Sequence, residues 1–181
     1  MAQAQLVRQN RAKASLLKRL DPYWKMEAAN MVAIPVLAFG LTKGQISWIS
    51  LVPLAATVLL LGIGTAYWWM KVRQLRRDDA NHEAVLRWLS RLQLPSLLLT
   101  LAGVLSAALG RAIPELSVGL ADRITAAVCA ALAVLEYVNY YHRQLQHFDN
   151  KADFRRLLAG KGFRPSWMAR DLAAWRARTP L

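Results

Sequence analysis

The sequence predicts an all-α membrane protein with four transmembrane helices, cytoplasmic N- and C-termini, helical cytosolic extensions and a C-terminal amphipathic helix. Two charge-free runs carry the prediction, since residues 44–70 have no charged side chain over 27 positions and residues 92–110 have none over 19. About 20 apolar residues cross a hydrocarbon core roughly 30 Å thick, so both runs are long enough. The third observation is that Lys and Arg gather on alternate connections.

Composition fits this class. Of 181 residues, 55% are hydrophobic and 19% are charged, which excludes intrinsic disorder. The single cysteine excludes an internal disulfide framework and a four-cysteine zinc site. A soluble helical bundle is the alternative, but an apolar helix about 40 Å long is too large for so small a domain to surround. We therefore expect residues 1–181 to form a single polytopic membrane domain.

The first predicted span covers about residues 22–42, with Asp21 as the N-cap and Pro22 as the first helical residue. Only residues 28–42 are free of charge, so this span is weaker than the next. Residues 1–21 form a basic N-terminal segment in which the first twenty positions hold no acid. We expect this segment to lie in the cytosol on the anionic leaflet, and a transit peptide is the alternative.

The second predicted span covers about residues 46–70. Trp48 lies at one end and the run Tyr67-Trp68-Trp69 at the other, as expected of aromatic side chains at the two membrane–water interfaces. The third span covers about residues 95–112, and Pro95 starts or kinks it. An amphipathic cytosolic stretch precedes it.

The fourth predicted span covers about residues 118–141, and its helix continues to about Phe148. Residues 149–181 form a basic cytosolic tail whose final helix is capped by Ser166. Three apolar residues of that helix share one face: Met168, Leu172 and Trp175. This face either lies on the inner leaflet or packs against the other helices of the chain.

The positive charges set the orientation. Of the 24 Lys and Arg residues, 21 lie before residue 28, between the second and third spans, or after the fourth span. The other two connections hold three: Lys43, Arg111 and Arg123. Four spans then place both termini in the cytoplasm of a multi-pass protein of a cell inner membrane. A net charge of +13 would otherwise favour nucleic acid, but a polybasic cytosolic face explains it without that partner.

Small and polar residues form a seam on each of the last two spans. The third span carries Ser96, Thr100, Gly103, Ala107 and Gly110, and the fourth carries Asp122, Ala126, Cys129 and Ala133. Contact faces inside a membrane are enriched in such residues, so we predict that the two seams pack on each other. We expect Arg111 to be the partner of Asp122.

The candidate binding site is a polar cluster at the cytoplasmic mouth of the helices. One face of the fourth helix carries Glu136, Asn139, Tyr140, Arg143 and His147. Glu27 and Asn30 of the first span lie at a similar depth. A carboxylate there needs a partner, and Arg143 and Asn30 are the candidates for Glu136.

Three roles remain open for this cluster: a structural interface, a binding site for a lipid head group or small anion, and catalysis. We assign no catalytic residue and expect no cofactor. We expect no metal either, since His142 and His147 lie roughly 140° apart around a helix.

The sequence leads us to expect a non-catalytic accessory or scaffold subunit that presents its polybasic cytosolic face to a partner protein or to anionic lipid of the inner leaflet. It would act as a homo-oligomer or as a subunit of a membrane complex. One alternative is an oligomeric channel or small-solute carrier lined by hydroxyl side chains: Thr57, Thr65, Thr100 and Ser106. The other is an interfacial membrane enzyme that uses the stripe from Glu136 to His147.

Overall fold

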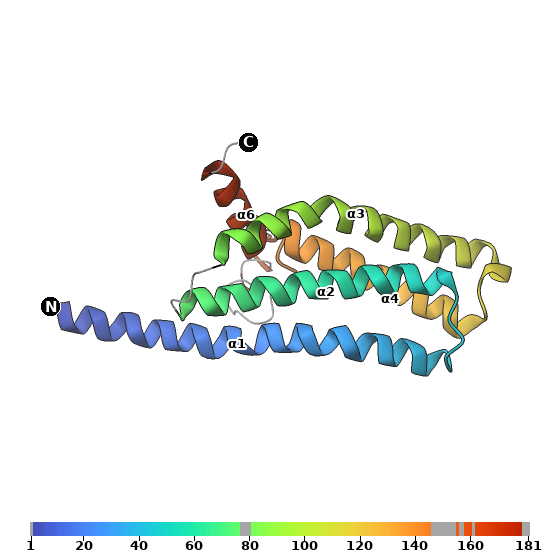
Figure 1. Ribbon diagram of the computed structural model, residues 1–181, viewed down its shortest axis with the longest axis horizontal. Coiled ribbons are helices and arrows are strands. Elements are labelled where there is room, and N and C mark those ends of the chain that lie inside the picture. The colour runs from blue at the N-terminus through green and yellow to red at the C-terminus, as the bar shows by residue number, and fades with distance from the viewer. Residues whose placement is uncertain (1, 77–80, 146–154, 156–157, 161, 179–181) are drawn as a thin grey trace.

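The computed structural model describes residues 2–76, 81–145, 155, 158–160 and 162–178. Its elements are α1 (Ala2–Leu41), α2 (Trp48–Leu75), α3 (His82–Ala112), the 3₁₀ turn η1 (Pro114–Leu116), α4 (Leu120–Tyr141) and α6 (Trp167–Arg178). The described residues contain no strand, only an isolated bridge between Arg143 and Pro165. Four long helices lie side by side, and α6 lies across one end of them (Figure 1).

Three helices, α2, α3 and α4, are long and apolar enough to cross a membrane. They contain the predicted spans at 46–70, 95–112 and 118–141 almost entirely. Helix α1 contains the predicted span at 22–42 but is not one of these three. Large apolar side chains such as Leu98 and Ile124 are exposed on the outer faces. Such faces are unfavourable in water and favourable in hydrocarbon, which suggests a membrane-embedded protein.

Helix α2 lies at the centre and packs against α1, α3 and α4. A Cβ atom on Gly103 of α3 would lie 2.9 Å from the Cα of Pro53 of α2. On the other side, the hydroxyl of Thr57 donates a hydrogen bond of 2.9 Å to the carbonyl of Cys129 in α4. Gly103 of one seam and Cys129 of the other therefore both contact α2, which the predicted packing of the two seams on each other did not include, while α3 and α4 are also in contact. Helix α2 carries the longest charge-free run, so apolar neighbours can cover it on several sides.

Asp122 of α4 joins the start of α2. Its carboxylate accepts hydrogen bonds from the backbone N–H of Ser47 (3.2 Å) and from the hydroxyls of Ser47 and Ser50 (2.5 Å each). Arg111, the partner expected from sequence, is exposed, and this expectation is wrong. The N–H groups of a first helical turn have no intrahelical acceptor, so a carboxylate is well placed there.

Two helices extend further toward their N-termini than expected. Helix α1 begins at Ala2 and passes through Pro22, where the sequence predicted a helix start. Residues 2–20 are mostly strong helix formers, so the helix continues through Asp21. The Asp21 carboxylate forms ion pairs with Lys25 and Arg76 and does not cap a helix. Helix α3 likewise begins at His82 and includes Pro95, so the expected amphipathic stretch and the third span form one helix.

Helix α4 is shorter than expected. It ends at Tyr141, so the predicted continuation to Phe148 is wrong for residues 142–145, and the remainder lies outside the described residues. The backbone N–H of Gln144 donates to the carbonyl of Arg164, and that of Ser166 donates to the carbonyl of His142. These long-range pairs replace the helical hydrogen bonds of the next turn.

The pairing of residues 142–144 with 164–166 brings α6 onto the other helices. Met168 and Leu172 are buried in a cluster that also contains Leu89 and Tyr141. The carboxylate of Asp171 accepts a hydrogen bond of 2.8 Å from the hydroxyl of Tyr67 and forms an ion pair of 2.6 Å with Lys71. Of the two arrangements left open by the sequence, the structure has α6 packed against its own chain.

Candidate functional site

The most polar buried cluster formed by the predicted site residues lies where α1, α2 and α4 meet. It consists of Glu27 from α1 with Glu136 and Tyr140 from α4, and we call it the polar junction. The Tyr140 hydroxyl interacts with both carboxylates, and the two carboxylates interact with each other. Glu27 and Tyr140 are each only 2% exposed. Helices far apart in the sequence thus bring two acids to one phenol.

Gly64 of α2 makes room for this phenol. A Cβ atom at Gly64 would lie 2.0 Å from the hydroxyl oxygen of Tyr140 and 2.4 Å from its ring carbon Cζ. Any side chain there would occupy the volume that the hydroxyl now fills. The absence of a side chain on α2 therefore fixes the depth at which Tyr140 sits between the two carboxylates.

The polar junction has few hydrogen-bond donors. The Tyr140 hydroxyl can donate one bond, whereas the two carboxylates offer four acceptor oxygens. The hydroxyl oxygen of Tyr140 and Oε2 of Glu136 are both buried without a hydrogen-bond partner of good geometry. The ion pairs of the described residues include neither Glu27 nor Glu136. Buried polar atoms without partners cost free energy, so the junction favours any donor that reaches it.

Asn139 supplies part of that donation. Its amide oxygen accepts a hydrogen bond of 2.9 Å from the backbone N–H of Leu145, which leaves the amide NH₂ as the donor toward Glu136. Asn139 and Tyr140 also line a cavity of about 20 Å³ between α2, α4 and α6. A site of that size holds one water molecule. Chemically, the carboxylates of the junction can accept hydrogen bonds from a donor that reaches them.

Two further predicted site residues, Asn30 and Arg143, do not join this cluster. Asn30 is partly buried on α1, and the described contacts of the junction do not include it. Arg143 lies beyond the end of α4, is exposed, and donates to the carbonyl of Phe163 at 3.1 Å. The neighbours of Glu136 are therefore Asn139, Tyr140 and Glu27, not Arg143 or Asn30. His147 lies outside the described residues.

Gly64 of α2, which makes room for the Tyr140 ring in the polar junction, was not predicted from the sequence. A glycine in a long apolar helix is the only local signal, and it does not reveal which side chain fills the space above it. Among the described residues, no group of three or more His, Cys, Asp or Glu side chains lies close enough to hold a metal ion.

The hydroxyl groups named for a pore lie largely between helices of the chain. The Thr100 hydroxyl donates to the carbonyl of Ser96 at 2.7 Å, and that of Ser106 donates to the carbonyl of Ile49 at 3.1 Å. Thr57 is fully buried between α2 and α4. Thr65, which is partly buried beside Met31, is the only one of the four toward the outer surface of the described chain.

Comparison with protein-family models, curated proteins and solved structures gave no match to this chain. The class of the protein therefore follows from its fold alone. It is a helical protein with three helices able to cross a membrane, and a buried contact of Glu27 with Tyr140 and Glu136 joins α1 to α4.

Proposed function

We propose that the chain is a four-span protein of a cell inner membrane with both termini in the cytoplasm. In this proposal it acts as a non-catalytic accessory or scaffold subunit, and its polybasic cytosolic face receives a partner protein or anionic lipid. The observation that carries the proposal is the gathering of basic side chains at one end of the long helices.

That end is where α2 finishes, α3 begins and α6 docks, and the first half of α1 extends past it (Figure 1). Exposed basic side chains there include Arg87, Arg91, Arg170 and Arg178. Among the residues that the structure describes, the opposite end holds three Lys and Arg residues: Lys43, Arg111 and Arg123. Connections rich in Lys and Arg remain on the cytoplasmic side, and each such residue near an anionic leaflet contributes about 1 kcal/mol.

The packing of α1 supports its assignment as a membrane span in addition to α2, α3 and α4. It lies along α2, and its second half turns large apolar side chains outward, with Val32 at 66% and Leu37 at 62% exposure. Its carboxylate Glu27 instead faces α4 in the polar junction. A helix with its apolar side chains outward and its acid inward is suited to lipid.

Helix α6 is held in place on the other helices, so its basic side chains have fixed positions. Asp171 ties it to Tyr67 and Lys71 of α2, and the Arg176 guanidinium donates to the side chain of Gln93 at 2.6 Å. Arg170 and Arg178 stay exposed on the docked helix. A rigid presentation of charge lowers the ordering cost of binding.

Purification from native membranes in mild detergent tests the accessory role. We expect wild type to retain a stoichiometric protein partner or bound anionic lipid, and R170Q/R178Q to lose it. The control K43Q/R111Q removes two exposed cations from the opposite end and is expected to behave as wild type. If wild type retains neither, or if both double variants lose the same species, the proposal is wrong.

Cysteine labelling tests the topology. With Cys129 changed to Ala, single cysteines at Gln45 and Arg178 are probed with a membrane-impermeant maleimide in inverted vesicles. We expect Arg178→Cys to react and Gln45→Cys to be protected until the membrane is dissolved. Equal labelling of the two positions would contradict the three crossings between them, and a protected single cysteine at Ser15, before the predicted span of α1, would contradict the crossing by α1.

A further inference from the structure

The polar junction brings two carboxyl groups together without a cation. Glu27 of α1 and Glu136 of α4 interact with each other, and both interact with the hydroxyl of Tyr140. The ion pairs of the described residues include neither of these two acids. Like charges repel strongly where the dielectric constant is low, so ionising both carboxyls inside the molecule is unfavourable.

The atoms of the junction are closed off from water. Glu27 and Tyr140 are each only 2% exposed, and Oε2 of Glu136 is buried. Among the described residues, neither this oxygen nor the Tyr140 hydroxyl oxygen has a hydrogen-bond partner of good geometry. The cluster therefore has two acids and, between them, a fully buried phenol whose hydrogen bonds are incomplete.

The count of hydrogen-bond donors indicates how many protons the junction takes. With both carboxyls ionised, two side chains donate to them, the hydroxyl of Tyr140 and the amide of Asn139. A proton on one carboxyl adds a third donor and removes one of the two charges. The single carboxylate that remains then has donors on several sides, which a buried charge requires.

A water-sized cavity reaches the junction from the end at which α6 docks. Its volume is about 20 Å³, and its lining includes Tyr140 and Asn139 of α4, Tyr67 of α2 and Ser166. A cavity of this size holds one water molecule. That water supplies a route by which a proton passes between the solvent and the Tyr140 hydroxyl.

The other ionisable groups around the junction are paired with one another. Tyr67 of α2 donates to the carboxylate of Asp171 of α6 at 2.8 Å, and Lys71 pairs with the same carboxylate at 2.6 Å. On α1, Lys25 pairs with Asp21 at 2.5 Å. These cations already have carboxylate partners, so they do not balance the two acids of the junction.

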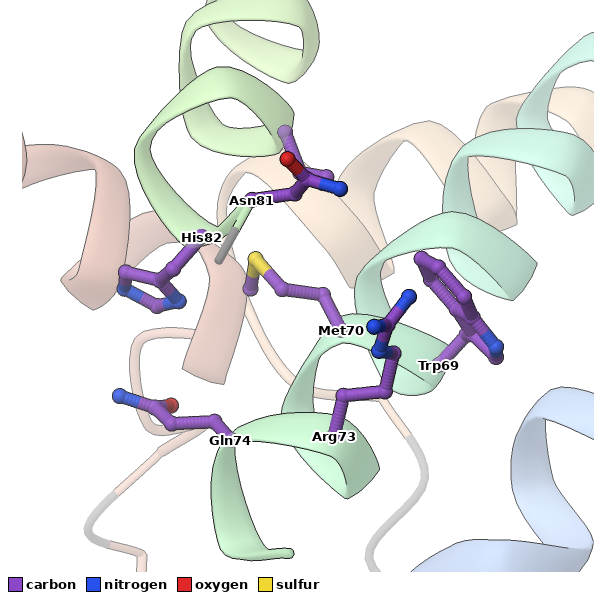
Figure 2. A pocket seen from close by; sticks show the side chains of 7 residues that line it. Trp69, Met70, Arg73, Gln74, Asn81 and His82 are labelled. Atoms are coloured by element: carbon purple, nitrogen blue, oxygen red, sulfur yellow. The ribbon is translucent and has the colours of Figure 1, made fainter. Parts of the chain in front are cut away.

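Histidine is another source of a response to pH near neutrality. His82 of α3 lines a separate pocket of about 10 Å³ with Met70 and Gln74 of α2 (Figure 2). His142 follows the end of α4, where its ring lies 5.5 Å from that of Tyr137. Neither histidine belongs to the polar junction. Variants of the junction keep both, so a comparison with wild type cancels their contribution.

We propose that the polar junction binds one exchangeable proton, shared by Glu27, Glu136 and Tyr140, and that this proton stabilises the packing of α1 against α4. In the binding step a carboxylate oxygen takes one proton from water and becomes a hydroxyl that donates to the facing carboxylate. Release returns the proton to water and leaves two negative charges between the helices. The proposal needs neither a partner protein nor the polybasic face.

Infrared difference spectroscopy of the purified full-length chain in mild detergent detects the proton directly, because a protonated carboxyl and a carboxylate absorb at different frequencies. We expect wild type to show the band of a protonated carboxyl at neutral pH and E27Q/E136Q to lack it. The matched control is E115Q, which makes the same change at an exposed glutamate and should keep the band.

Thermal unfolding measures what the proton contributes to stability. Both carboxyls ionise in the unfolded chain near neutrality, so unfolding releases the proton. The folded state then binds one proton more than the unfolded state, and stability falls as the pH rises. The unfolding equilibrium constant should rise up to about tenfold per pH unit relative to E27Q/E136Q, between about pH 5 and pH 8. E115Q should follow wild type.

Circular dichroism and elution volume show whether E27Q/E136Q is folded. If it is not, E27Q and E136Q decide the outcome singly. Each removes the charge that faces the remaining carboxyl, so the band should disappear at a lower pH than in wild type.

Three results would overturn the proton site. The first is that wild type lacks the band at neutral pH, and the second is that folded E27Q/E136Q keeps it. The third is that replacing choline chloride with sodium chloride at constant ionic strength removes the band, since a sodium ion would then occupy the junction. Melting temperatures of wild type and E27Q/E136Q that change in parallel with pH would show that the proton does not stabilise the fold.

Discussion

The fit of Tyr140 over Gly64 makes a quantitative prediction for G64A. The added Cβ would lie 2.0 Å from the Tyr140 hydroxyl oxygen, whereas ordinary van der Waals contact begins at 3.4 Å. The phenol must therefore retreat by more than 1 Å, and it is almost fully buried. Overpacking of this kind costs typically 1–3 kcal/mol and strains the polar junction as well. For a chain of this size we expect a melting temperature lower by about 2–12 °C.

Thermal unfolding in detergent is the assay, and G62A is the matched control. Gly62 lies two residues away on the same helix, and its Cβ would make an ordinary contact of 3.4 Å with the end of Met31. Alanine is the better helix former by about 1 kcal/mol, so G62A should be neutral or stabilising. If G64A has the same melting temperature as G62A and wild type, the Tyr140 hydroxyl does not occupy the space beside Gly64. Y140L in the G64A background should restore stability because leucine is shorter than tyrosine.

Three further substitutions follow from the same packing. G103A should lower stability by about 1–3 kcal/mol because its Cβ would press on the Pro53 backbone, while G40A, which meets nothing, should not; equal melting of the two would contradict the central position of α2. D122A should cost about 2 kcal/mol or more by removing the acceptor at the start of α2, and a melting curve like wild type would contradict that role. E136Q should raise the melting temperature, since an amide adds a donor beside Glu27 in a junction that lacks donors; a marked loss of stability would show that the carboxylate itself is required.

The sequence predicted the helical class and the three most apolar helices because charge-free length depends only on local composition. It also predicted that Glu27, Glu136 and Tyr140 lie at a similar depth, since depth follows from counting residues along each helix. It did not predict which faces meet. A small-residue seam allows close approach by any helix, so the sequence does not identify its neighbour. The structure is needed to show that Gly103 packs on Pro53 and that Gly64 packs on Tyr140.

The end of α4 shows why the position of Arg143 could not be predicted from the sequence. No glycine or proline follows Tyr141 for several residues, so helical periodicity predicts that the helix continues and that Arg143 shares a face with Glu136. The helix stops there because Ser166, 24 residues later than His142, donates its backbone N–H to the His142 carbonyl and its hydroxyl to the Tyr140 carbonyl. That one serine also accepts the N–H of Ala169 and so caps α6. The same contact therefore ends α4 beneath the polar junction, removes Arg143 from it and begins the helix that presents Arg170 and Arg178. The polar junction and the basic face therefore share one anchor, and S166A should destabilise the packing of α4 and of α6 together, which thermal unfolding measures.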